Sequence, residues 1–209
     1  MKDKIIKSNK LNLGCEKEYK NGWLNVDFDR RVRADAYVDL NKFPWPWKDD
    51  SFDEILASAI IEHLDDFYKV MRELHRIGKQ GCKIYILLPH ASEIANSFAE
   101  VEHKWTYSYH TFGSIWANKE LWHLFRVLKR RVSFTRINFQ FMNKIMNPLV
   151  NLFPFVWERC FSGIVPCGVV VFILEVRKDK KYQDFRKKEL EDYEKNYSKF
   201  DNLKFIKEV

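Results

Sequence analysis

Short runs of apolar residues alternate with polar, glycine-containing turns through the first 90 residues of the chain. Their length and β-branched content are typical of buried strands. We expect five such strands, at residues 11–15, 23–26, 36–40, 52–57 and 82–89. Between the fourth and fifth runs, apolar residues recur at helical spacing over residues 67–77, and Gly78 is placed to end that helix. This order of strands and helix predicts an α/β fold built on a parallel sheet.

The second half of the chain continues the sheet. Residues 131–141 alternate in part and predict a sixth strand, and residues 168–176 predict a seventh that could pair with it in the antiparallel sense. Residues 142–166 form an apolar, aromatic insertion between them, and a charged, helix-compatible stretch follows the last strand. We therefore expect a domain at residues 1–178 and a charged helical extension at residues 179–209.

The insertion at residues 142–166 has two interpretations that the sequence leaves open. Polar residues and prolines interrupt it, so it is not expected to form the run of about 20 apolar residues that spans a membrane. It is either a broken helix that packs over the sheet or forms a homodimer contact, or a lid for a lipid-linked substrate and a surface for peripheral membrane contact.

The ends of the first two strands carry residues suited to a nucleoside. Gly14 and Cys15 end the first, and Asp27 ends the second. A glycine after a buried strand lets the backbone approach a ligand, and a carboxylate on the next strand can accept both ribose hydroxyls. A dinucleotide site would need G-x-G-x-x-G to hold a pyrophosphate. Glu16 follows instead, and its carboxylate would repel phosphate but suit a ligand with an ammonium and a sulfonium, so the pattern favours S-adenosylmethionine.

The same edge of the sheet is expected to receive residues from the next two strands. Asp39 and Leu40 end the third, and Ser58 follows the fourth. The aromatic loop at residues 43–47 could cover an adenine or close one end of the core, and the sequence does not separate these alternatives. Only about a dozen residues separate Gly14 from the second strand end, so the first crossover helix must be shortened, since a full strand–helix–strand unit takes about 30 residues.

These segments resemble the class I S-adenosylmethionine-dependent methyltransferases, in particular their small type-11-like group. The chain reads NLGCE, NGWLNVD, DAYVDL, FPWPWKDDSFDEI and IIEHL where the group has N-L-G-C-G, G-W-x-N-V-D, an acidic third strand, a proline-rich loop before S-F-D-E-I, and L-E-H. PHAS and HKWTYSYHTF continue the resemblance, which runs from residue 11 to residue 178.

The resemblance implies a Rossmann-like, seven-stranded, mostly parallel sheet with an antiparallel last strand and helices on both faces. It also implies S-adenosylmethionine as cofactor and a methyltransferase activity on a small molecule, a sugar or glycan, or a lipid-linked acceptor. The residues expected to bind the cofactor are Gly14, Cys15, Glu16, Asp27, Asp39, Leu40 and Ser58. Glu16 stands where the group usually has glycine, a change that could reduce or abolish activity.

Histidines are the candidates for catalysis. Methyl transfer is an in-line displacement, so a protein mainly orients the acceptor and excludes water, and a general base is needed only when the acceptor must lose a proton. His90 is the first candidate because it ends the fifth strand, at the edge where open α/β sheets bind ligands, and His103 is the second. His63 and His110 are further histidines that could line the same pocket.

The composition also predicts where the protein is located and whether it binds a metal. The four cysteines are widely spaced and form no C-x-x-C pair, so we expect buried thiols and no bound metal. The first ten residues lack the apolar core of a signal peptide, so a cytoplasmic location is expected.

The net charge of +7 supports an alternative from another functional class. Basic runs at residues 129–131 and 177–181 could contact phosphates, as in a catalytically weak or inactive Rossmann-like protein that binds RNA or another acidic polymer. No recognised RNA motif accompanies these runs, and the enzyme is the preferred interpretation.

Overall fold

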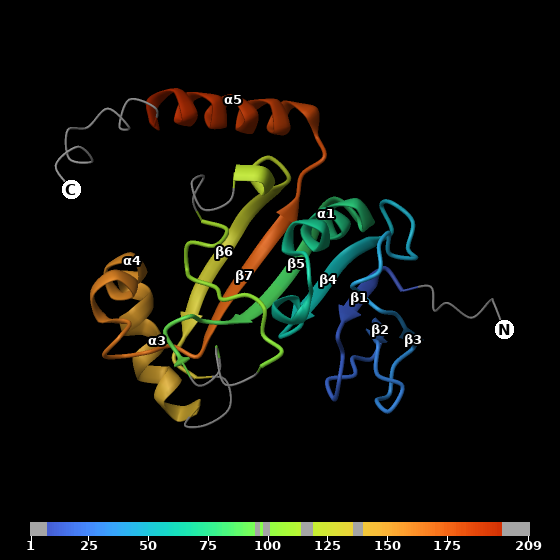
Figure 1. The fold of residues 1–209 in the computed structure, drawn as a ribbon, viewed down its shortest axis with the longest axis horizontal. Helices are drawn as coiled ribbons and strands as arrows, with labels where there is room; N and C mark the ends of the chain where they lie inside the picture. Colours follow the sequence, from blue (N-terminus) through green and yellow to red (C-terminus); the bar gives the residue numbers. More distant parts are fainter. Residues whose placement is uncertain (1–7, 95–96, 98–100, 114–118, 136–139, 198–209) are drawn as a thin grey trace.

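The computed structural model describes residues 8–94, 97, 101–113, 119–135 and 140–197, and its centre is a seven-stranded sheet in the order β3-β2-β1-β4-β5-β7-β6 (Figure 1). Adjacent strands from β3 to β5 are parallel, and β7 is antiparallel to both β5 and β6. The strands are β1 (Lys10–Leu13), β2 (Leu24–Asp27), β3 (Ala36–Tyr37), β4 (Phe52–Ser58), β5 (Gly78–Pro89), β6 (Phe125–Ser133) and β7 (Val169–Val176). The predicted Rossmann-like, mostly parallel sheet with an antiparallel last strand is confirmed.

The connections in the first third of the chain are unusually short. Residues 14–23, between β1 and β2, contain turns and no helix, which confirms the shortened first crossover. The crossover from β4 to β5 carries the 3-10 turn η1 (Ile61–His63) and helix α1 (Phe67–Ile77). The Asp66 side chain begins α1 by accepting the backbone N–H of Lys69 at 3.0 Å, and the buried face of α1 follows the apolar pattern of the sequence.

The predicted placement of the sixth strand, at residues 131–141, is wrong. The strand lies earlier, at Phe125–Ser133, and residues Gln140–Met142 form a short 3-10 helix; residues 136–139 lie outside the described part of the chain. The reason is that β6 is an edge strand with Arg126, Lys129 and Arg131 exposed, so its polar positions hide the period-two pattern on which a strand prediction depends.

The aromatic loop at residues 43–47 closes one end of the core. Trp45 is only 2% exposed, and its backbone N–H donates to the Glu73 carboxylate of α1 at 2.7 Å. The Trp47 ring lies 5.9 Å from the ring of Phe52, which begins β4. These contacts tie the loop to α1 and to the amino end of β4, so they support the packing role and not an adenine cover.

Two helical parts of the second half lie at opposite ends of the sheet (Figure 1). The insertion comprises α3 (Asn143–Leu152), α4 (Pro154–Val156) and the π-helical turn η4 (Trp157–Phe161), beside the carboxyl end of β6. Helix α5 (Lys180–Tyr197) lies at the other end, where the Tyr182 hydroxyl donates to the Phe125 carbonyl at 2.9 Å. Among the described residues, no helix is long and apolar enough to cross a membrane.

Amide side chains hold the insertion on the edge of the sheet. Asn151 Nδ2 donates to the Val132 carbonyl at 2.7 Å, and Asn151 Oδ1 accepts the Val132 N–H at 3.0 Å. Asn147 Oδ1 accepts the Phe134 N–H at 2.8 Å. The asparagines that interrupt the apolar insertion therefore face the sheet, and most of its large apolar residues lie on the outside.

Candidate functional site

The carboxyl ends of the parallel strands meet at one edge of the sheet. Leu13 of β1 is in register with Val26 of β2 and Ala57 of β4, and Ser58 is in register with Leu87 of β5. Ligands of open α/β sheets bind at this edge because the loops that leave the strands diverge there.

The first two strand ends are joined as the sequence predicts. The backbone N–H of Glu16 donates to Asp27 Oδ2 at 2.9 Å, and that of Cys15 donates to the Val26 carbonyl at 3.0 Å. Gly14 has φ +60°, a conformation that favours glycine, and an added Cβ would lie 2.7 Å from the Ile60 side chain. Gly14 and Asp27 are therefore brought together, and the close neighbour of the glycine is Ile60.

These contacts decide which nucleoside ligand the edge can hold. The N–H groups of Cys15 and Glu16, which would cradle a pyrophosphate in a dinucleotide fold, are already donated within the turn. Asp27 is 6% exposed, and its second oxygen accepts the Asp29 N–H at 2.9 Å. Each carboxylate oxygen has about two acceptor sites, so Asp27 keeps one on each oxygen for a diol. The geometry fits an adenosyl group without phosphates.

Cys15 contributes bulk to this turn and not reactivity. Burial, with the nearby Asp27 charge, raises the pKa of the Cys15 thiol to about 11, so the group is uncharged at neutral pH. Glu16 adopts φ +38°, which is uncommon for a residue with a side chain. The glycine usual at this position in the resembled group would adopt that conformation without strain.

The other residues predicted to bind the cofactor lie near the same edge. Asp39 is exposed and pairs with Lys42 at 3.4 Å, while Leu40 is buried and its carbonyl accepts the Trp45 indole N–H at 3.0 Å. Ser58 ends β4 and is half-buried. Their roles in binding stay predictions.

His90 lies at the end of β5, as predicted, but both of its ring nitrogens are engaged. Nδ1 accepts the Ser92 backbone N–H at 3.1 Å, and Nε2 lies 3.0 Å from Glu158 Oε1. Because a backbone N–H can only donate, Nε2 carries the proton that is shared with Glu158. His90 is 2% exposed, so the geometry favours a positioning role, and its action as a general base stays a prediction.

Glu158 is a site residue that the sequence analysis missed. It comes from the π-helical turn of the insertion, and its Oε1 also accepts the Tyr109 N–H at 2.8 Å, while Oε2 lies 3.5 Å from His110 Nε2. Burial favours the neutral acid, but the hydrogen bonds from His90 and Tyr109 and the two imidazoles outweigh it and lower the Glu158 pKa. The sequence carried one signal for this residue, because Glu158 is the only acidic residue in the apolar insertion at residues 142–166.

His103 is placed in a different cluster from His90. Its ring lies 4.7 Å from the ring of His63, and the next residue, Lys104, donates its N–H to the Glu62 carbonyl at 2.8 Å. The His63–His103 pair and the His90–Glu158 pair are nevertheless neighbours, because residues 103–110 link them and Tyr107 pairs with His90 in an isolated bridge.

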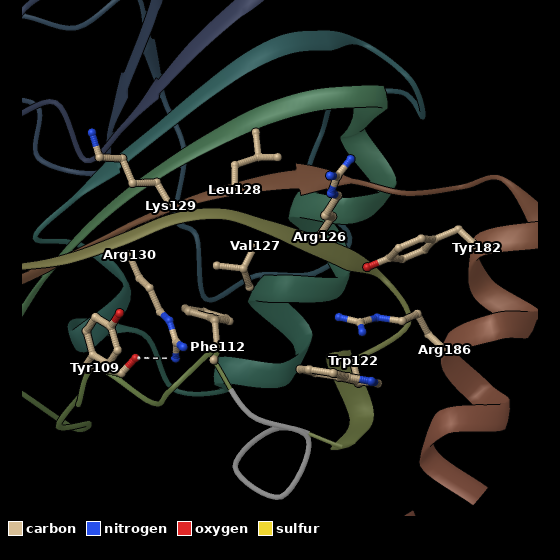
Figure 2. Close-up of a pocket in the computed structure, with 11 residues that line it drawn as sticks. Tyr109, Phe112, Trp122, Arg126, Val127, Leu128, Lys129, Arg130, Tyr182 and Arg186 are labelled. Atoms are coloured by element: carbon tan, nitrogen blue, oxygen red, sulfur yellow. Dashed lines mark hydrogen bonds between the residues drawn. The ribbon is translucent and has the colours of Figure 1, made fainter. Parts of the chain in front are cut away.

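A basic hollow of about 610 Å³ lies between β6, the loop before it and the start of α5, and Tyr109 connects it to Glu158 (Figure 2). Arg130 lies over the Tyr109 ring at 4.3 Å and donates to the Tyr109 carbonyl at 3.5 Å. Arg186 of α5 lies 3.8 Å from the centre of the Trp122 ring. Arginine and aromatic planes thus line a surface suited to anions.

Part of the chain is similar to a known protein family. Residues 18–86 match the methyltransferase domain family. No curated protein sequence matches the chain.

Solved structures share the fold at low sequence identity. An S-adenosylmethionine-dependent methyltransferase from Archaeoglobus fulgidus is 16% identical, with a TM-score of 0.54 over 79% of this chain and 85% of that one. The YcgJ protein of Bacillus subtilis is 13% identical, with a TM-score of 0.52 over 81% and 92%. The [4+2]-cyclase SpnF is also 13% identical, with a TM-score of 0.52 over 80% and 74%. Residues 18–86 are thus similar to the methyltransferase domain family, and the chain shares the fold of solved S-adenosylmethionine-dependent methyltransferases.

Proposed function

We propose that this protein transfers a methyl group from S-adenosylmethionine to a nucleophilic acceptor at the carboxyl edge of the sheet. The observation that carries the proposal is the turn in which Asp27 holds the backbone after Gly14 and keeps acceptor sites for a ribose diol. The fold does not settle the reaction, since a [4+2]-cyclase shares it. The match of residues 18–86 to the methyltransferase domain supports methyl transfer.

The chain's own residues have separate tasks in this reaction. S-adenosylmethionine supplies an electrophilic methyl group on a sulfonium. Asp27 binds the ribose, and the acids of the turn, Asp27 and Glu16, offer a negative environment for a cationic ligand. Of His90, Glu158 and His110, the Glu158 carboxylate and His110 are the more exposed. They are therefore the groups best placed to take a proton from an acceptor, while His90 orients Glu158.

The acceptor class is suggested by the insertion, where most of the large apolar side chains face outward. Eight large apolar residues there are between 47% and 78% exposed, namely Ile145, Leu149, Leu152, Phe153, Phe155, Val156, Phe161 and Ile164. The same segment supplies Glu158, which contacts His90, so the apolar surface adjoins the proposed site. Such a surface is typical of a membrane or lipid contact. We therefore favour a lipid-linked acceptor over a small polar molecule or a free glycan.

A second candidate function rests on the basic hollow. Arg126, Arg130 and Arg186 line it together with aromatic rings, a combination that binds phosphates and bases. None of its lining residues belongs to the cofactor turn, so binding of RNA or another acidic polymer there would not need that turn.

Replacing Asp27 by Ala is expected to weaken S-adenosylmethionine binding at least tenfold. A hydrogen bond to a charged group contributes about 1.5–3 kcal/mol, and about 1.4 kcal/mol is tenfold in affinity. Isothermal titration calorimetry measures the affinity. Asp27→Asn removes the charge but preserves the side-chain volume, and Asp53→Ala, at the amino end of β4, is the matched control. Equal affinity in wild type and Asp27→Ala would place the cofactor elsewhere, and no heat with folded wild type would leave methyl transfer unsupported.

Replacing Glu158 by Gln is expected to lower the free energy of unfolding by about 1–3 kcal/mol at pH 7, because a buried charged acceptor is lost. The folded pKa of Glu158 is lowered, so its contribution is complete above the ordinary value of 4.5 and is lost as the pH falls through the folded value. Urea unfolding from pH 7 to pH 3 should show the two proteins converging at acid pH. Glu120→Gln, in an exposed ion pair, is the control. A difference that does not change with pH would contradict this assignment.

The double variant Phe153→Ser/Phe155→Ser is expected to bind lipid vesicles at least tenfold more weakly than wild type. Burying one Phe side chain contributes about 1.5–3 kcal/mol, and both rings are more than half exposed. Co-sedimentation with vesicles of phosphatidylcholine and phosphatidylglycerol measures the binding, and Tyr68→Ser on α1 is the control. The lipid proposal is wrong if wild type stays in the supernatant or if the double variant sediments as wild type does.

If the hollow binds an acidic polymer, the affinity for a single-stranded oligonucleotide should fall steeply with salt. Each phosphate contact contributes about −0.7 to the slope of log K against log salt, so Arg130→Ala should make the slope less steep by about that amount. Fluorescence anisotropy at roughly 50 to 300 mM salt measures the slope, and Arg159→Ala is the control. Weak binding that does not respond to salt counts against this function.

A further inference from the structure

Glu62, His63 and His103 form a cluster at the carboxyl edge to which the proposed function gives no task. One ligand atom from each residue lies within 4.8 Å of the others. We propose that these three side chains bind a divalent transition-metal ion, of the zinc or ferrous class, which activates a hydroxyl of the methyl acceptor. The metal site stands on its own geometry, and only its role toward the acceptor rests on the proposed function.

Local structure holds the three side chains in place. The 3-10 turn η1 positions Glu62 and His63 next to each other after β4. The segment that carries His103 runs along this turn, because Lys104 N–H donates to the Glu62 carbonyl at 2.8 Å and the Trp105 indole N–H donates to the Leu64 carbonyl at 2.8 Å. These bonds fix the chain directly after His103 against η1, so His103 reaches the cluster from a defined backbone position.

The donor set has the chemistry of a metal site with open positions. Two imidazoles and one carboxylate are a set that binds zinc in hydrolytic enzymes and ferrous iron in oxygenases, with other positions left for a substrate. Donor atoms about 2.1 Å from a tetrahedral ion are about 3.4 Å apart, so the ligand atoms must approach one another by up to about 1.4 Å to bind it, which side-chain rotation can supply. The sequence predicted no metal because its cysteines lack the spacing of a zinc site.

The cluster is shielded from solvent. Glu62 is 1% exposed, so an ion bound to its carboxylate would be largely out of contact with bulk water. Tyr107 is 3% exposed, and its hydroxyl has no hydrogen-bond partner among the described residues. A buried hydroxyl without a partner is typical of a site that a water or an ion completes.

The cluster lies between the cofactor turn and the His90–Glu158 pair. Ile60, against which Gly14 packs, directly precedes η1, and Tyr107 pairs with His90. An acceptor must lie in this region, since the methyl group has to reach it from the adenosyl side.

A divalent ion there would act as a Lewis acid and make an acceptor hydroxyl easier to deprotonate. The released proton passes to Glu158 or to solvent. The oxygen then forms a bond to the methyl carbon as the carbon–sulfur bond breaks, and the electron pair of that bond stays on sulfur, which becomes a neutral thioether. No oxidant or reductant is needed. The acceptor class that fits is a hydroxyl compound, best a vicinal diol or a catechol that can bind the ion through two oxygens.

Metal binding by chelator-treated, tag-free protein tests the site. Titration with Co²⁺, followed by visible absorption and by displacement with Zn²⁺, should show one equivalent bound by wild type. His103→Ala and Glu62→Gln should each bind Co²⁺ at least tenfold more weakly. His123→Ala, which removes a histidine outside both clusters, should bind as wild type does. The site is overturned if wild type binds no stoichiometric Co²⁺ or Zn²⁺, or if His103→Ala keeps the wild-type affinity.

Calorimetry with S-adenosylmethionine on the same metal-free proteins separates this site from the proposed function. Wild type, His103→Ala and His123→Ala should bind the cofactor equally, which also shows that the variants are folded. Stoichiometric Co²⁺ binding without cofactor binding would uphold the metal site and reject its role in methyl transfer. Cofactor binding without stoichiometric metal would uphold the proposed function and reject the metal site.

Discussion

The carboxylate of Asp27 is the contact on which the candidate site depends. It accepts the N–H groups of Glu16 and Asp29, so it holds the chain leaving β1 against the chain leaving β2. No helix covers this crossover, and its polar backbone groups must find partners elsewhere. The fully buried Asn25 supplies several, since its side chain accepts the Lys20 N–H at 2.8 Å and donates to the Lys20 carbonyl at 3.0 Å. Side-chain amides and carboxylates thus replace the missing helix.

The acceptor side is assembled by parts of the chain that lie far apart in sequence. Residues 103–110 run along the edge of the sheet and bring His103 to Glu62 and Tyr107 to His90. The insertion reaches the same place through Glu158, which bonds to His90. Because one glutamate joins the apolar surface to the histidines, the proposed binding at that surface and the proposed chemistry at the edge would share a direct contact.

Much of the first half could be predicted, since its signals are local. Helix α1 begins and ends where the apolar spacing and Gly78 place it, and the strand ends at Gly14 and Asp27 meet because parallel strands finish at one edge. Strand β6 was misplaced because an exposed edge strand rich in arginine lacks the buried alternation. Glu158 was missed since its importance comes from a contact across 68 positions with His90, which no local pattern contains.

Periodicity and the residues at strand ends were enough to predict the sheet and the short first crossover, and to propose an adenosyl site without a phosphate cradle. Those features depend on residues that are close in sequence, because the types and spacing of nearby residues set the local backbone conformation. The role of the aromatic loop, the separation of His90 from His103, and the meeting of Glu62, His63 and His103 needed the folded chain. Packing brings distant side chains together, and their distances and burial, not their spacing along the chain, set the chemistry they can perform.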